Sequence, residues 1–154
     1  MTLSDTKDLA TVVAAAVAVF TLVKGFIEYR SQGRQKRAEQ FLELRKRLKD
    51  NPSFKNICAL IEIDDPPLAT VPFREKRDFL GFFEEVALFT NSGLLPQAVA
   101  HYMFGYYAIR CWDSQYFWTD VNRDGIYWSL FRDFVERMKR VESGFAFKPA
   151  EFRF

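Results

Sequence analysis

The chain has 154 residues, of which 49% are hydrophobic and 17% aromatic, and its formal net charge is +2. This length suits one domain with a short appended segment, and the apolar content is enough for a sizeable core. The mean hydropathy of -0.17 excludes a protein built mainly of membrane spans, so the sequence predicts at most one.

The first predicted element is an apolar helix near the N-terminus. Residues 9–23 are apolar except for Thr11 and Thr21, and a helix over residues 9–27 would be about 28 Å long. The hydrocarbon core of a bilayer is roughly 30 Å thick, so we expect a transmembrane anchor over residues 1–29. A cleaved signal peptide and a buried helix of a soluble domain are the alternatives. The acidic start argues against the first and the basic flank against the second.

One side of this helix carries small residues. Alanines recur every four residues, and a threonine, a lysine and a glycine follow, so the predicted membrane and oligomer face is Ala10, Ala14, Ala18, Thr21, Lys24 and Gly25. Small residues let helices approach closely, and we therefore expect a homo-oligomer. The alternative is that alanine is simply common in short anchors.

A basic helix is predicted over residues 30–50. Residues 1–50 hold ten Lys or Arg and six Asp or Glu, whereas residues 51–154 hold twelve and fourteen. The predicted basic surface consists of Arg30, Arg34, Lys36, Arg37, Arg45, Lys46 and Arg47. By the positive-inside rule the N-terminus would lie outside and the rest of the chain in the cytoplasm. Anionic lipid headgroups are the expected partner, and RNA is the alternative.

The remaining elements complete an all-α prediction, with a cytoplasmic helical domain over residues 51–143 and an aromatic tail over residues 144–154. Asn51 starts a short helix, Thr70 is a predicted N-cap for a helix that stops at Gly93, and Pro96 opens a helix that reaches residue 118. The turn chemistry of residues 122–125 precedes a last helix over residues 126–142.

The sequence offers no recognised catalytic or metal-binding pattern. His101, Cys58 and Cys111 lack zinc-site spacing, and the cysteines are expected to pack as reduced, small apolar residues. Asp120 begins half of an EF-hand pattern, but Phe131 occupies the position that needs a bidentate Glu, so an interhelical turn is expected instead. We predict no metal, no cofactor and no enzymatic activity.

Two acidic residues interrupt the apolar face of the helix after residue 72. Glu84 and Glu85 lie among phenylalanines, and a carboxylate drawn into the interior needs a partner. Arg110, on the next helix, is the predicted partner in a structural ion pair.

The segments "FLGFFEEVALFTNSGLL" and "YMFGYYAIRCWD" resemble the DUF4760 family of small bacterial membrane proteins. The layout is similar to the one-span accessory proteins of type VI-B CRISPR systems, which form membrane pores and carry a divergent HEPN-like domain. The resemblance implies a bacterial inner-membrane protein. The Arg and His pair of HEPN ribonucleases is missing, because residues 94–96, which precede His101 at the required spacing, contain no Arg.

The resemblance implies an oligomeric effector or accessory protein of antiphage defence, with a pore in the inner membrane as its expected mode of action. The alternative is a membrane-anchored adaptor that recruits a protein partner without forming a pore. Lys24 distinguishes the two, because a pore-lining charge would control ion selectivity. The tail phenylalanines, Phe145, Phe147, Phe152 and Phe154, are expected to dock on this domain, another subunit or the bilayer interface.

Overall fold

The computed structural model describes residues 3–144, with side chains described for residues 16–28, 32–33 and 35–144. These residues form six α-helices, α1 to α6, and three short helical segments, η1 to η3. They contain no β-strand. The prediction of an all-helical protein is therefore confirmed for this part of the chain.

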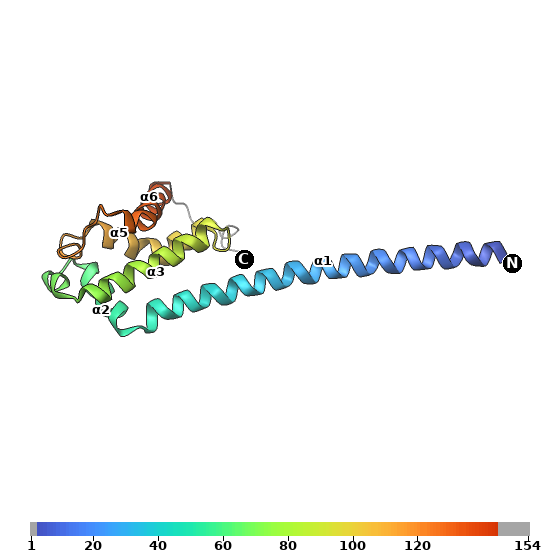
Figure 1. Ribbon diagram of the computed structural model, residues 1–154, viewed down its shortest axis with the longest axis horizontal. Coiled ribbons are helices and arrows are strands. Elements are labelled where there is room, and N and C mark those ends of the chain that lie inside the picture. Colours follow the sequence, from blue (N-terminus) through green and yellow to red (C-terminus); the bar gives the residue numbers. More distant parts are fainter. Residues whose placement is uncertain (1–2, 145–154) are drawn as a thin grey trace. The chain divides into compact units, whose positions relative to one another are not determined.

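α1 (Leu3–Asp50) is a single helix that continues through Gly33 and joins the two segments predicted over residues 1–29 and 30–50 (Figure 1). The chain nevertheless divides into two compact units, Met1–Ala38 and Glu39–Phe154. The last turns of α1 therefore belong to the second unit, and the rest of the helix belongs to the first.

The predicted transmembrane anchor over residues 1–29 is wrong. Within the described part of the chain, no helix combines the length and the apolarity that a membrane crossing requires. The ion pair of Lys24 and Glu28, with 3.9 Å between Nζ and Oε1, places two charged side chains at the end of the predicted span. The predicted location in the inner membrane, with the N-terminus outside, is wrong for the same reason. The predicted pore required that location and is also withdrawn.

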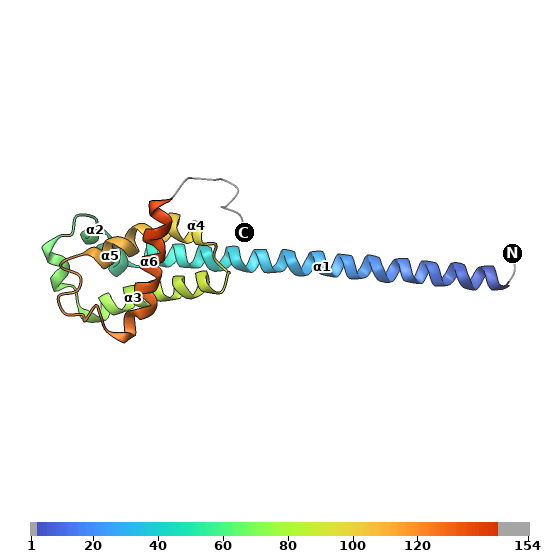
Figure 2. The same ribbon diagram turned by 90° about the horizontal axis from the view of Figure 1, so that it is seen from above.

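α2 (Pro52–Glu62) begins where the sequence predicts. The Asn51 side chain accepts hydrogen bonds from the backbone N–H groups of Ser53, at 2.9 Å, and Phe54, at 3.3 Å. These bonds satisfy two of the donors that a helix start leaves without partners, and Pro52 has no N–H to satisfy. At Asn51 the chain turns from the end of α1 into α2 (Figure 2).

α3 (Phe73–Asn91) follows the short segment η1 (Pro66–Thr70) and begins after Pro72. The predicted N-cap role of Thr70 is wrong, because its hydroxyl donates to the Pro67 carbonyl, 2.8 Å away, and so belongs to η1. The predicted stop at Gly93 is confirmed: its φ of +71° lies in the left-handed region that favours glycine.

The helix predicted from Pro96 to residue 118 is divided into three pieces and ends early. These are α4 (Gln97–Ala100), the π-helical segment η2 (His101–Gly105) and α5 (Tyr106–Asp113). Two side chains explain the early end. The Ser114 hydroxyl accepts from the backbone N–H of Phe117, at 3.0 Å, and the Trp118 indole donates to the Cys111 carbonyl, at 2.9 Å. Together they turn the chain and satisfy a carbonyl in the last turn of α5.

η3 (Ile126–Trp128) leads into α6 (Ser129–Ser143), which packs against α3 and α5 (Figures 1 and 2). The core between these helices is rich in aromatic rings that meet mostly edge to face, for example Phe79 and Phe83 with centroids 5.1 Å apart. Its fully buried phenylalanines are Phe79, Phe82, Phe83, Phe104, Phe117, Phe131 and Phe134.

Candidate functional site

The first unit exposes an unusual amount of apolar surface. Seven large apolar residues of α1 are each between 52% and 73% exposed: Val17, Val19, Phe20, Leu22, Val23, Phe26 and Ile27. We call residues 16–27 of α1 the apolar stretch. A helix that is apolar around its whole circumference is normally buried, so this surface is a candidate interaction site.

The described part of the predicted small-residue face lies within the apolar stretch. Ala18, Thr21 and Gly25 are exposed, and a Cβ built at Gly25 would meet nothing within 4 Å. The Thr21 hydroxyl donates to the Val17 carbonyl, 2.8 Å away, so it presents no free donor to a neighbour. Lys24, also a member of this face, is exposed and pairs with Glu28. Ala10 and Ala14, which complete the predicted face, lie outside the residues whose side chains are described.

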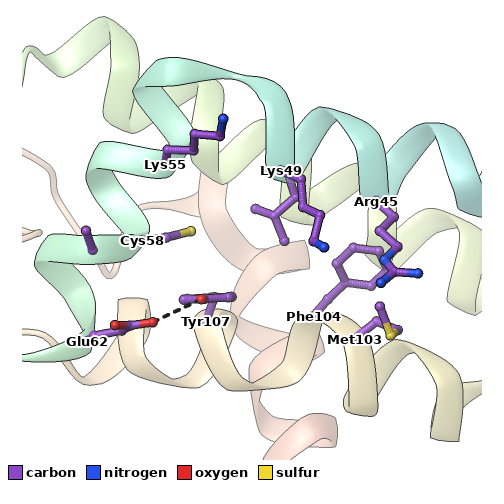
Figure 3. Close-up of a pocket in the computed structure, with 10 residues that line it drawn as sticks. Arg45, Lys49, Lys55, Cys58, Glu62, Met103, Phe104 and Tyr107 are labelled. Carbon is purple, nitrogen blue, oxygen red and sulfur yellow. Dashed lines mark hydrogen bonds between the residues drawn. The ribbon is translucent and has the colours of Figure 1, made fainter.

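The second unit contains a pocket of about 340 Å³ between the end of α1, α2 and the η2–α5 region (Figure 3). Apolar atoms provide most of its lining, with cations on α1 and α2. The lining residues are Arg45, Leu48, Lys49, Lys55, Cys58, Ala59, Glu62, Met103, Phe104 and Tyr107. This volume lies at the small end of the range for ligand-binding pockets, about 300 to 1,000 Å³.

Local structure explains how these residues meet. Arg45 and Lys49 are four residues apart on α1, so they lie on the same side of the helix, one turn from each other. The turn at Asn51 brings Cys58 and Glu62 of α2 to the same cavity. Segments with π-helical hydrogen bonding often occur at functional sites, and η2 supplies Met103 and Phe104.

Two polar side chains form one end of the pocket. The Tyr107 hydroxyl donates to Glu62 Oε1, 3.1 Å away (Figure 3). Burial, and then the hydrogen bond to Glu62, raise the pKa of Tyr107 to about 12, so the phenol remains a neutral donor at physiological pH. Burial also raises the pKa of the Cys58 thiol to about 12, which leaves it protonated and a poor nucleophile.

The structure gives Glu85 a different ionic partner from the predicted Arg110. Arg47 binds Glu85 through both guanidinium nitrogens, with Nη1–Oε2 and Nη2–Oε1 distances of 2.5 and 3.2 Å. Arg110 instead lies over the Tyr106 ring, 5.4 Å from its centroid. Burial raises the pKa of Glu84, and a backbone hydrogen bond from Phe131 opposes that shift.

The described residues of the predicted basic surface have different surroundings. Arg45 lines the pocket and Arg47 pairs with Glu85, whereas Lys36 and Lys46 are exposed and Arg37 is half-buried. Arg30 and Arg34 lie outside the residues with described side chains. The aromatic tail over residues 145–154 likewise lies outside the described chain.

Side chains that could bind a metal ion or act as nucleophiles lie in a turn and in the core of the second unit. Within residues 3–144, no group of three or more His, Cys, Asp or Glu side chains is placed to hold a metal ion. The predicted interhelical turn is confirmed at Asn122, whose side chain accepts from the backbone N–H of Asp124 at 3.2 Å. Cys111 is fully buried, and burial raises its pKa.

Sequence reasoning missed most of the pocket. The spacing of Arg45 and Lys49 was a visible signal that two cations share one helix face. Tyr107 and Met103 gave no such signal, because they reach the pocket only through the folding of α5 and η2 against α1.

No family profile, curated protein or solved structure matches this chain. The resemblance to the DUF4760 family and to the CRISPR accessory proteins therefore stays a prediction.

Proposed function

We propose that the protein is a self-associating adaptor, in which the apolar stretch of α1 joins copies of the chain and the second unit binds a partner. The apolar stretch carries this proposal, because seven large apolar side chains are at least half exposed on a single helix. Burying such surface is the main favourable contribution to protein association in water.

A second copy of α1 suits this surface better than an unrelated groove does. The stretch is apolar on opposite sides, with Ala18 and Gly25 on the small face and Phe20 and Val23 on the large one. Identical helices match it in length, and the small face allows a close approach between them. Symmetric homodimers are the commonest closed assemblies.

The order of charges in the sequence favours an antiparallel arrangement. Asp5 and Asp8 precede the apolar stretch, whereas Lys36 and Arg37 follow it. Parallel packing would align the basic ends of two copies, and antiparallel packing brings each basic end towards an acidic one.

The test is the mass of the intact chain in solution, measured by analytical ultracentrifugation. We expect a discrete dimer or higher oligomer of the 18.1 kDa chain. The double variant Phe20→Lys/Val23→Lys should sediment as a monomer, because it places charges on the large face. The variant Gln32→Lys/Gln40→Lys adds the same charge at exposed positions of α1 outside the stretch, and it should remain oligomeric.

Three outcomes would contradict the proposal. The first is a monomeric wild type, and the second is an equal loss of association in both variants. The third is a wild type that binds phosphatidylcholine vesicles as a monomer in a flotation assay. The adaptor role itself requires that the oligomer bind a protein partner through the second unit. The role in antiphage defence and the binding of RNA stay predictions.

A further inference from the structure

We infer that the pocket between α1, α2 and α5 binds a small amphiphilic carboxylate, with the carboxylate at the Arg45 and Lys49 end and the apolar body over Leu48 and Cys58. A medium-chain fatty carboxylate is the ligand class that combines these two properties. The inference concerns the second unit alone and does not depend on self-association through α1.

The pocket lining contains more cations than anions. Three cations line the pocket, namely Arg45, Lys49 and Lys55, against a single carboxylate, Glu62. None of these three cations forms an ion pair within the described part of the chain. Their neighbour Arg47 shows the contrast, because Glu85 neutralises it. The pocket therefore has an excess of positive charge that an anion would balance.

The apolar lining excludes a simple inorganic anion as the best occupant. Phe104 is fully buried, and Leu48 and Cys58 are each only 8% exposed. Met103 and Ala59 extend the same wall. A phosphate or acetate ion would leave the apolar lining of the pocket exposed to water. An alkyl chain would cover this lining and gain the free energy of apolar burial.

The two ends of the pocket differ in charge, and this difference determines which way round a ligand would bind. Arg45 and Lys49 extend from α1 towards Met103 and Phe104, while the Glu62–Tyr107 hydrogen bond lies at the other end (Figure 3). The Glu62 carboxylate would repel a second carboxylate placed beside it. An anionic head is therefore favoured beside Arg45 and Lys49, with its chain directed towards Cys58.

The volume selects a small ligand rather than a macromolecule. About 340 Å³ admits a compact molecule but not a folded peptide segment. Octanoate is a suitable probe, because it has one carboxylate and a short flexible chain. Acetate shares the carboxylate without the chain, and octanol shares the chain without the charge.

Isothermal titration calorimetry of octanoate into the full-length protein tests the inference. We expect one site per chain for octanoate, and at least tenfold weaker binding of acetate and of octanol. Arg45→Gln/Lys49→Gln should weaken octanoate binding at least tenfold. Lys36→Gln/Lys46→Gln removes the same charge from exposed positions of α1 outside the pocket lining, and it should change the affinity less than twofold.

Two further measurements test whether octanoate binds in the pocket itself. Ala59→Phe should block octanoate by filling the pocket without altering its charge, and circular dichroism checks that each variant remains folded. The titration is repeated in the Phe20→Lys/Val23→Lys variant, where octanoate adsorbed on the apolar stretch would be lost but binding in the pocket retained.

Several results would overturn the inference. Absence of saturable octanoate binding would do so, as would equal weakening by the two charge-removing variants. Acetate binding as tightly as octanoate would reduce the pocket to a simple anion site. A glutamate-rich peptide that binds at Arg45 and Lys49 where octanoate does not would replace the small ligand with an acidic protein partner.

Discussion

Lys76 shows how strongly a single residue can depend on the packing around it. Its side chain is completely buried, and its Nζ donates to the Ala69 carbonyl at 3.3 Å and lies 5.9 Å from the centroid of the Phe117 ring. Burial lowers the pKa of Lys76, and the negative charge of Asp120 opposes that shift. The charged amine therefore costs stability in the folded state, and the hydrogen bond and the ring offset only part of this cost.

This residue gives a pH-dependent prediction with a definite sign. The pKa of Lys76 is lower in the folded protein than the ordinary 10.5, so between these two values the unfolded chain binds more protons. Stability contributed through Lys76 must therefore rise as the pH rises through this window. Lys76→Met has no proton to lose, so its stability relative to wild type should fall between pH 7 and pH 10.5. Urea unfolding of both proteins at these two pH values measures the difference, and an unchanged difference would contradict the prediction.

At the scale of elements, sequence signals located the helix boundaries that depend on local chemistry. Asn51 caps α2 and Gly93 terminates α3 as predicted, because a cap and a left-handed turn involve only a few neighbouring residues. The early end of α5 was not predictable, since Ser114 also donates to Asp64, fifty residues away, at 2.5 Å. Long-range contacts of this kind leave no periodic signal in the sequence.

The same distinction applies to the candidate sites. The apolar stretch was evident from composition, although its assignment to a membrane was wrong. The partner of Glu85 was chosen by apparent proximity, and the tertiary fold brings Arg47 to it instead. The pocket combines residues from α1, α2, η2 and α5, so only the folded chain reveals it.

The π-helical segment η2 is closely packed at Gly105. A Cβ at Gly105 would lie 3.0 Å from His101 Cδ2 and 3.6 Å from Met138 Sδ, so η2 is packed too closely for a larger residue. We expect Gly105→Ala to destabilise the protein by about 1–3 kcal/mol through overpacking. At Gly81, within α3, a Cβ would meet nothing within 4 Å, and Gly81→Ala should stabilise by about 0.5–1 kcal/mol. Chemical denaturation compares the two, and equal effects would show that the His101 ring yields without cost.

At the scale of the whole molecule, the hydrophobic core lies in the second unit, whereas the apolar stretch with its exposed side chains lies in the first. The hydrophobic core begins at Leu44 and ends at Met138, entirely within the second unit. The large apolar side chains described in the first unit are exposed instead. This separation fits a chain in which one unit folds around its own core and the other acquires its apolar contacts from another molecule.

Two truncations test this separation. Removing residues 1–38 leaves the core cluster intact, so the shortened chain should unfold cooperatively with a free energy within about 1 kcal/mol of a monomeric full-length variant. Removing residues 1–50 also deletes Leu44, Leu48 and Arg47. Loss of a buried leucine side chain costs about 2–5 kcal/mol, and small domains have only about 5–15 kcal/mol in total, so this second truncation should be largely unfolded. Phe20→Lys/Val23→Lys is the full-length reference, because it should remove the contribution of association. If the first truncation were as unstable as the second, α1 before residue 39 would belong to the cooperative unit, and its apolar stretch would serve folding rather than assembly.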